Sequence, residues 1–142
     1  MNSITGEEPA KHRIYTHEFV VQPNEIDAMG HVNNVVYLKW VQDAAEAHWL
    51  TKASQDVKAK YSWVVLRHEI DYLAPAFAGQ TIEATTWVEN YQGVRSDRIV
   101  HLINKESKKV LAKAKTTWCL LDAATQRPKR IESDIASVFS PQ

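Results

Sequence analysis

Residues 25–40 read Glu-Ile-Asp-Ala-Met-Gly-His-Val-Asn-Asn-Val-Val-Tyr-Leu-Lys-Trp, a polar, turn-forming run that leads directly into an amphipathic segment. Gly30 allows the backbone to turn sharply. Either Asn33 or Asn34 can begin a helix, because an asparagine side chain accepts a hydrogen bond from an unpaired first-turn amide. Asp27 is therefore expected close to a helix N-terminus, where exposed amides favour negative charge. A carboxylate beside such a helix end is half of an acyl-transfer site.

Apolar residues continue at helical spacing from about Asn34 to Lys52, which predicts one long helix. The apolar stripe consists of Val36, Tyr37, Trp40, Val41, Ala44, Ala47 and either His48 or Leu50. The opposite stripe is polar and contains Lys39, Gln42, Asp43 and Glu46. No second long helix is predicted.

Alternation with period two predicts strands on both sides of this helix. The expected strands cover residues 14–22, 61–73, 81–90, 95–105 and 110–121, with turns at Gln92-Gly93 and over residues 122–128. Residues 1–12 are expected to be a loose extension, and residues 132–142 a C-terminal tail with a short helix from Ser133 to Phe139. The chain is thus predicted to be one α+β domain over residues 1–142, an antiparallel sheet wrapped around one central helix. Because one helix leaves the sheet edges open, we expect at least a dimer.

The composition, with 44% apolar and 24% charged residues, is typical of a globular domain. A formal net charge of zero gives no support to a nucleic-acid-binding function. No apolar run approaches the ~20 residues that span a bilayer, and no signal segment is recognised, so no membrane insertion is expected. The single cysteine, Cys119, is expected to pack inside a strand, and a cytoplasmic location is expected. The six histidines show no zinc-ligand spacing, so no metal is expected.

Three segments together resemble a known family. They are Asp27-x-x-Gly-His-Val-Asn-Asn-x-x-Tyr-Leu-x-Trp40, His68-Glu-Ile-Asp-Tyr-Leu-x-Pro-Ala-x-x-Gly79 and Trp118-x-x-x-Asp-x-x-Thr-x-Arg-Pro128. Their spacing resembles that of the 4-hydroxybenzoyl-CoA thioesterase-like acyl-CoA thioesterases, which have the hotdog fold. The likeness covers about residues 14–131.

The resemblance implies a hotdog fold, a homodimer or homotetramer, and active sites that lie between subunits. Asp27 matches the catalytic carboxylate of many members, and the backbone amide of Asn34 matches the donor that polarises the thioester carbonyl. His-Val-Asn-Asn also resembles the motif of acyl-carrier-protein thioesterases, which makes His31 and Asn33 further catalytic candidates. Tyr37 and Trp40 are expected in the core and pocket wall. With Gly30, they are the candidate substrate-binding residues.

Thioester hydrolysis suits a small site, because the leaving thiol has a pKa near ~8.5 and departs readily. It needs a nucleophile or a base that activates water, together with donors for the oxyanion. The hypothesis is an acyl-CoA thioesterase without cofactor, since coenzyme A is part of the substrate. Asp27 acts either as base or as nucleophile. Glu46 is expected at the surface or an interface, and coenzyme A phosphates are expected to meet surface cations, with Arg67, Arg95 and Arg98 as candidates.

Three other functions fit the same fold. The first is an acyl-carrier-protein thioesterase, the second a hotdog hydratase or dehydratase, and the third a non-catalytic acyl-CoA-binding protein. Fold alone does not separate them.

Overall fold

The structure is a computed structural model that describes residues 9–10 and 13–139 of the 142-residue chain. Apart from residues 9 and 10, the expected extension over residues 1–12 lies outside the described residues. The elements in chain order are β1 (Tyr15–Val20), a short 3-10 helix η2 (Pro23–Glu25), α1 (Asn34–Lys52), α2 (Gln55–Lys60), β2 (Tyr61–Tyr72), β3 (Thr81–Gln92), β4 (Arg95–Asn104), β5 (Val110–Asp122) and α3 (Ser133–Phe139).

The five strands form one antiparallel sheet in the order β1-β3-β4-β5-β2. The predicted turn at Gln92-Gly93 is confirmed: it links β3 to β4, and Gly93 has a φ of +61°, which glycine adopts without strain. β2 pairs with β5 along one side, from Tyr61 opposite Asp122 to Tyr72 opposite Ala112. β1 and β2 are therefore the two edges of the sheet.

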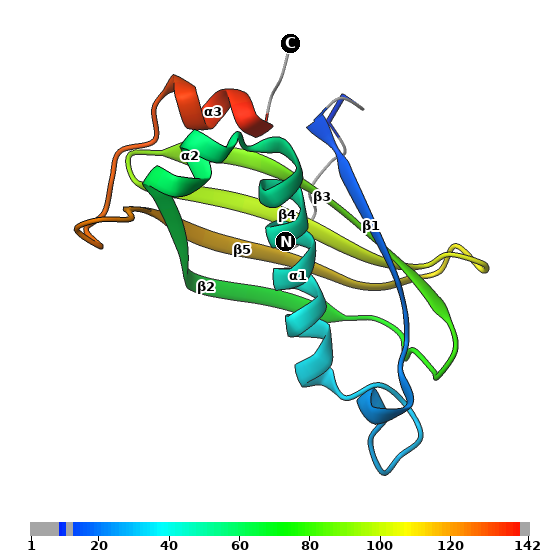
Figure 1. The fold of residues 1–142 in the computed structure, drawn as a ribbon. Coiled ribbons are helices and arrows are strands. Elements are labelled where there is room, and N and C mark those ends of the chain that lie inside the picture. Colours follow the sequence, from blue (N-terminus) through cyan, green and yellow to red (C-terminus); the bar gives the residue numbers. More distant parts are fainter. Residues whose placement is uncertain (1–8, 11–12, 140–142) are drawn as a thin grey trace.

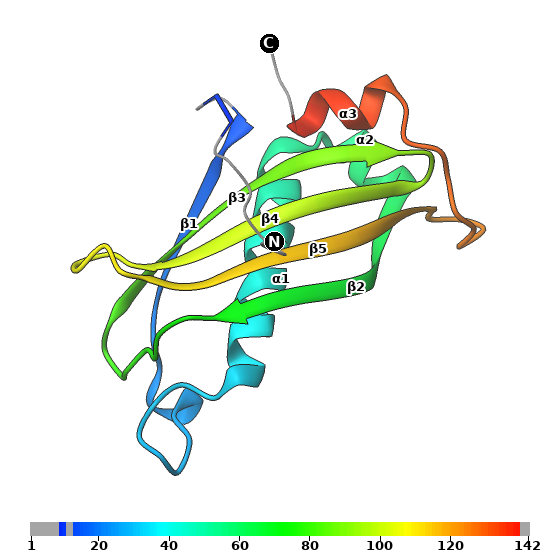
Figure 2. The same cartoon turned by 180° about the vertical axis from the view of Figure 1, so that it is seen from behind.

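The long helix α1 lies across one face of the sheet (Figure 1), whereas none of the described helices covers the opposite face (Figure 2). The side of α1 that faces the sheet matches the predicted apolar stripe, except that Ala45 is buried while the predicted Ala47 is only half-buried. Its buried residues are Tyr37, Trp40, Val41, Ala44, Ala45 and His48. Of the two alternatives at the end of the stripe, His48 is buried and Leu50 is 53% exposed. Periodicity thus predicted correctly which face of the helix packs on the sheet.

Two clusters of side chains form the core between the helices and the sheet. The first joins α1 to β1, β3, β4 and β5, and contains Trp40, Val41, Ala84, Val100 and Leu102. The second lies beneath α3 and contains Ile135, Val138 and Phe139 together with Leu120 of β5. Cys119 is free and buried in β5, in agreement with the expected packing role.

Two helices modify the sequence prediction. The short helix α2 was not predicted; Ser54 caps it by accepting a hydrogen bond from the Val57 amide at 3.2 Å. The short helix predicted from Ser133 to Phe139 is confirmed as α3, but it does not lie in a loose tail, because it buries Ile135, Val138 and Phe139. Residues 133–139 therefore belong to the core, because α3 packs its apolar side chains into the second cluster, with Leu120 of β5. No described helix is both long and apolar enough to cross a membrane.

Candidate active site

Asp27 lies in a tight turn directly before α1. Its amide donates to the His31 carbonyl at 2.8 Å, and the Gly30 amide donates back to the Asp27 carbonyl at 3.1 Å. Asp27 Oδ1 accepts a hydrogen bond from the Met29 amide at 2.9 Å, and Gly30 has a φ of +89°. A bridge between Ile26 and Val32 closes the base of the loop. Asp27 therefore has a structural role in the turn, and its second carboxylate oxygen receives none of the hydrogen bonds found among the described residues.

The start of α1 resolves the choice between the two asparagines. Asn33 is the cap residue, since its Oδ1 accepts a hydrogen bond from the Val35 amide at 3.0 Å. The Val36 amide donates to the Asn33 carbonyl at 2.9 Å. Within the described part of the chain, the Asn34 amide donates to no acceptor. This N–H is therefore a free donor. Because the positive end of the helix dipole lies at the same place, the donor is suited to an oxyanion.

The remaining candidates from the sequence lie around this helix start. His31 is partly buried and packs edge-on against Phe77, with ring centroids 5.9 Å apart. Tyr37 and Trp40 are buried in the core, where their rings stack at 5.3 Å, and burial raises the pKa of the Tyr37 hydroxyl. The loop thus brings Asp27, Gly30, His31, Asn33 and the Asn34 amide together, while Tyr37 and Trp40 lie beneath them.

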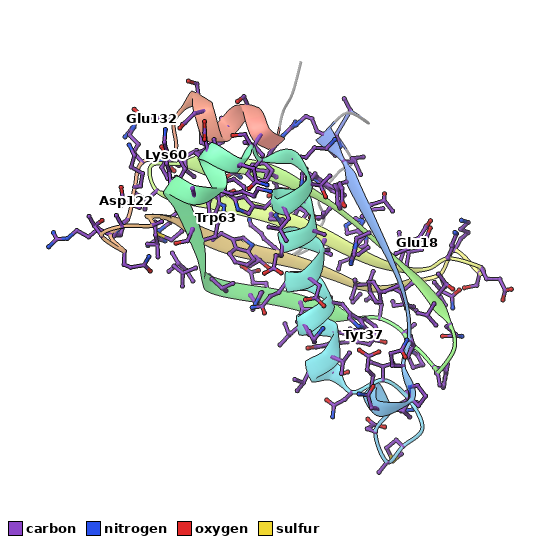
Figure 3. The ribbon with its side chains drawn as sticks, in the orientation of Figure 1. Glu18, Tyr37, Lys60, Trp63, Asp122 and Glu132 are labelled. Carbon is purple, nitrogen blue, oxygen red and sulfur yellow. The ribbon has the colours of Figure 1, made fainter. Side chains whose placement is uncertain are left out.

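A cavity of about 350 Å³ opens near the other end of α1. Much of its wall is aromatic, since the lining residues include Trp49, Tyr61, Trp63, Trp118 and Phe139. Figure 3 shows Trp63 on β2 near the C-terminal half of α1, well away from Tyr37 near the helix start. Glu46 and Leu50 are exposed lining residues and mark the mouth of the cavity. Glu46 is thus a surface residue, as expected, and is also the one carboxylate among the lining residues.

The floor of this cavity contains a buried arginine. Arg98 of β4 is 4% exposed, and its Nη1 donates to His48 Nδ1 at 2.9 Å and to Thr86 Oγ1 at 3.0 Å. Because a guanidinium can only donate, Nδ1 of His48 carries no proton and the ring proton is on Nε2. The expectation that Arg98 is a surface contact for coenzyme A phosphates is therefore wrong. Its alternation with Val100 and Leu102 along β4 places it on the inward face, a signal already present in the sequence.

Acid is expected to destabilise the protein through His48. Burial, followed by the charges of Arg98 and Lys52, lowers the pKa of His48 from 6.5 to about 3. In the unfolded chain the ring charges below pH 6.5, whereas the folded state keeps it neutral, so stability falls between pH 6.5 and about 3. Through His48 alone, the free energy of unfolding should drop by roughly 2 kcal/mol between pH 7 and pH 5. Burial also lowers the pKa of His101 to about 4, so that ring adds a drop of similar size. Urea unfolding measures the total, and His48→Asn, which keeps an acceptor but does not titrate, should reduce it by roughly 2 kcal/mol. An unchanged drop in the variant would contradict the assignment.

The loop and the cavity are too far apart to form one site within a single chain. Asn34 and Glu46 are both on α1, and twelve residues of α-helix span about 18 Å. In addition, the N-terminal end of α1 and the loop before it project beyond β2, the edge of the sheet (Figure 1). The catalytic candidates therefore extend away from their own cavity.

An antiparallel sheet wrapped around one long helix, with a carboxylate turn before the helix start, defines the hotdog class of thioesterase domains. The family model of the thioesterase-like superfamily matches residues 21–139, and the chain belongs to this family. It is accordingly a thioester hydrolase. Among curated proteins, no sequence matches this chain significantly.

Several solved structures have the same fold. A 1,4-dihydroxy-2-naphthoyl-CoA thioesterase from Synechocystis is 17% identical, with 90% of this chain and 96% of that chain covered and a TM-score of 0.78. A Staphylococcus aureus protein solved in complex with CoA is 16% identical, with 89% and 82% covered and a TM-score of 0.78. An acyl-ACP thioesterase from Bacteroides thetaiotaomicron is 23% identical, with 86% and 51% covered and a TM-score of 0.75. At such identities the likeness shows the shared fold.

Proposed function

We propose that the protein hydrolyses acyl-CoA thioesters, with Asp27 as base or nucleophile and the Asn34 amide as oxyanion donor. The observation that carries this proposal is the free Asn34 amide at the start of a 19-residue helix, in the same loop as the Asp27 carboxylate. The helix dipole favours the negative charge that develops on the carbonyl oxygen. The S. aureus neighbour in complex with CoA supports a coenzyme A thioester as the substrate.

The reaction needs no metal or redox cofactor. In the base mechanism, Asp27 takes a proton from a water molecule while the water oxygen attacks the carbonyl carbon. The tetrahedral intermediate then collapses, the C–S bond breaks, and coenzyme A leaves as a thiolate. In the nucleophile mechanism, an oxygen of Asp27 attacks the carbonyl carbon itself, the C–S bond breaks, and coenzyme A leaves as a thiolate. Water then hydrolyses the resulting mixed anhydride to the free acid and the Asp27 carboxylate. Both mechanisms place the negative charge against the Asn34 amide.

A homodimer would bring each loop to the cavity of the partner subunit. β2 is an edge strand, and exposed apolar side chains lie on it and beside it on α1: Val64, Leu66 and Leu50. Antiparallel pairing of two β2 edges creates a two-fold axis and places the two α1 helices side by side in opposite directions. The N-terminal loop of one helix would then lie near the C-terminal half of the other, where the cavity opens. Dimerisation thus accounts for a loop and a cavity at opposite ends of the same helix.

The function is tested by measuring coenzyme A release from acetyl, medium-chain, long-chain and aromatic acyl-CoAs. We expect turnover of at least one of these four kinds of acyl-CoA, because the aromatic cavity accepts an apolar acyl chain or ring. Turnover of acyl-carrier-protein thioesters alone would overturn the coenzyme A assignment. Tight binding of every acyl-CoA without turnover would instead identify a binding protein that has the fold but not the activity.

A further inference from the structure

The arginine at the floor of the cavity has no anionic partner among the described residues. No carboxylate there lies within 4.0 Å of its guanidinium. Its two protein hydrogen bonds, to His48 and Thr86, both use Nη1 and both end on neutral acceptors. Phe139 lies against the guanidinium, with 4.9 Å from Cζ to the ring centroid, and contributes only a cation–π contact. Within the described part of the chain, the charge is thus buried without an opposite charge to offset it.

Several donors on residues that line the cavity have no acceptor among the described residues. Arg98 has five N–H donors in a planar fork, and those on Nε and Nη2 donate to none of the described residues. Trp63 and Trp118 also line the cavity, and the indole N–H of each is buried without an acceptor. Buried polar groups are normally hydrogen-bonded, because leaving one unpaired costs about 1–3 kcal/mol. Unpaired donors beside a buried cation are the arrangement expected of a site that binds an anion.

Burial does not remove the charge at neutral pH. It lowers the pKa of Arg98 to about 9, which still leaves the guanidinium protonated. The neighbouring His48 stays neutral, and Glu46, the carboxylate among the lining residues, is exposed at the mouth and forms no ion pair with Arg98. A ligand that enters the cavity therefore meets a positive charge only at its far end.

We propose that the cavity binds an acyl group with an apolar body and a carboxylate at its far end, and that Arg98 selects this carboxylate. The assignment rests on the proposed thioesterase function, because the thioester end must remain at the mouth. Aromatic walls accept the apolar body, and a cavity of about 350 Å³ exceeds the ~150 Å³ that holds a benzene ring. A carboxylate fits the planar fork of a guanidinium through two parallel hydrogen bonds.

A binding experiment tests this inference without any turnover. Octanoate and octanol have the same apolar body, but only octanoate carries a carboxylate. Because Trp49, Trp63 and Trp118 line the cavity, tryptophan fluorescence reports binding of either probe. Octanoate is expected to bind wild-type protein roughly 10- to 100-fold more tightly than octanol, the ratio typical of a hydrogen-bonded charge.

Two matched substitutions assign this preference to one residue. Arg98→Met should abolish it, whereas Arg130→Met removes the same charge from an exposed position that does not line the cavity and should leave it unchanged. Equal binding of the two probes to wild-type protein would overturn the proposal, and so would an equal loss in Arg130→Met. If Arg98→Met does not fold, Arg98→Lys keeps the charge without the fork and should retain only part of the preference.

Kinetics with two thioesters separates this inference from the proposed function. The substrates are octanoyl-CoA and its analogue with a second carboxylate at the far end of the chain. The ratio of kcat/KM for the carboxylated over the plain substrate should fall roughly 10- to 100-fold in Arg98→Met. Hydrolysis of both substrates with the same ratio in wild type and variant would overturn the role of Arg98 alone. Absence of turnover on either substrate would reject the thioesterase function, while the binding results would still decide on the anion site.

Discussion

Replacing Asp27 with asparagine is expected to lower kcat for thioester hydrolysis by roughly 10²- to 10⁴-fold, the usual contribution of a positioned general base. Asparagine keeps an Oδ1 atom that can accept the Met29 amide, so the turn that positions the Asn34 amide should persist. The substitution therefore removes the negative charge without removing the loop. Initial rates of coenzyme A release at saturating substrate measure the loss.

The matched control for this experiment is Asp43→Asn. Asp43 is a carboxylate on α1, the helix that follows the Asp27 turn, and its ion pair with Lys39, at 2.8 Å, is exposed to solvent. Such a pair contributes about 0–1 kcal/mol, so this variant should keep wild-type turnover. Near-normal turnover in Asp27→Asn would show that Asp27 only shapes the turn. Glu46, at the cavity mouth, would then be the next carboxylate to replace.

Asp27→Asn also tests whether the active site is shared between two subunits. A second variant, Ala45→Trp, fills the cavity from α1, because Ala45 is a lining residue. Each variant alone should be inactive. Mixed dimers combine the intact Asp27 of one chain with the intact cavity of the other, so random mixing should restore about a quarter of wild-type turnover. No restoration would place loop and cavity function within one chain, because each chain then has a defective site.

Isotope labelling detects attack by the Asp27 carboxylate. In a single turnover in oxygen-labelled water, label can enter this carboxylate only if it has attacked the thioester and water then opens the anhydride at the Asp27 carbonyl. Label confined to the product acid is expected of a base that activates water, and equally of an anhydride that water opens at the acyl carbon. Mass spectrometry of the peptide that contains residues 25–40 reads out the difference.

The largest loss of stability is expected for Trp40→Ala, at about 3–5 kcal/mol. Trp40 is 3% exposed, and its ring contacts Tyr37 and also Phe19 of β1, with centroids 4.8 Å apart in the second pair. Its Nε1 donates to Glu25 Oε2 at 3.2 Å, which ties η2 to the helix. Alanine removes both the packing and this hydrogen bond, and urea unfolding at pH 7 measures the result.

Trp40→Phe is the control for this effect. Phenylalanine keeps most of the ring contacts but loses the donor, so the free energy of unfolding should fall by only roughly 1–2 kcal/mol. Equal losses in the two variants would mean that the hydrogen bond to Glu25, and not ring packing, accounts for the contribution of Trp40. Either result also bears on Trp40 as a candidate substrate contact, because a residue buried this deeply affects activity chiefly through the fold.

The fold was largely predictable because its signals are local. The predicted bounds of α1, from Asn34 to Lys52, agree with the structure, since the asparagine cap and the apolar stripe lie within one stretch of chain. The strands expected over residues 81–90 and 110–121 followed from alternation in the same way, and β3 and β5 cover these ranges. α2 was missed because six residues carry too little periodicity to identify a helix.

The candidate site was predictable only in part, for the same physical reason. The Asp27 turn and the start of α1 are contiguous in sequence, so the sequence by itself identified the loop, its free amide position and the hotdog class. The cavity joins residues from α1, β2, β4, β5 and α3, and the burial of Arg98 depends on His48, Thr86 and Phe139, which are distant along the chain. Whether an arginine lies at the surface or at the floor of a cavity is decided by which elements pack over it. That packing is a property of the tertiary structure alone.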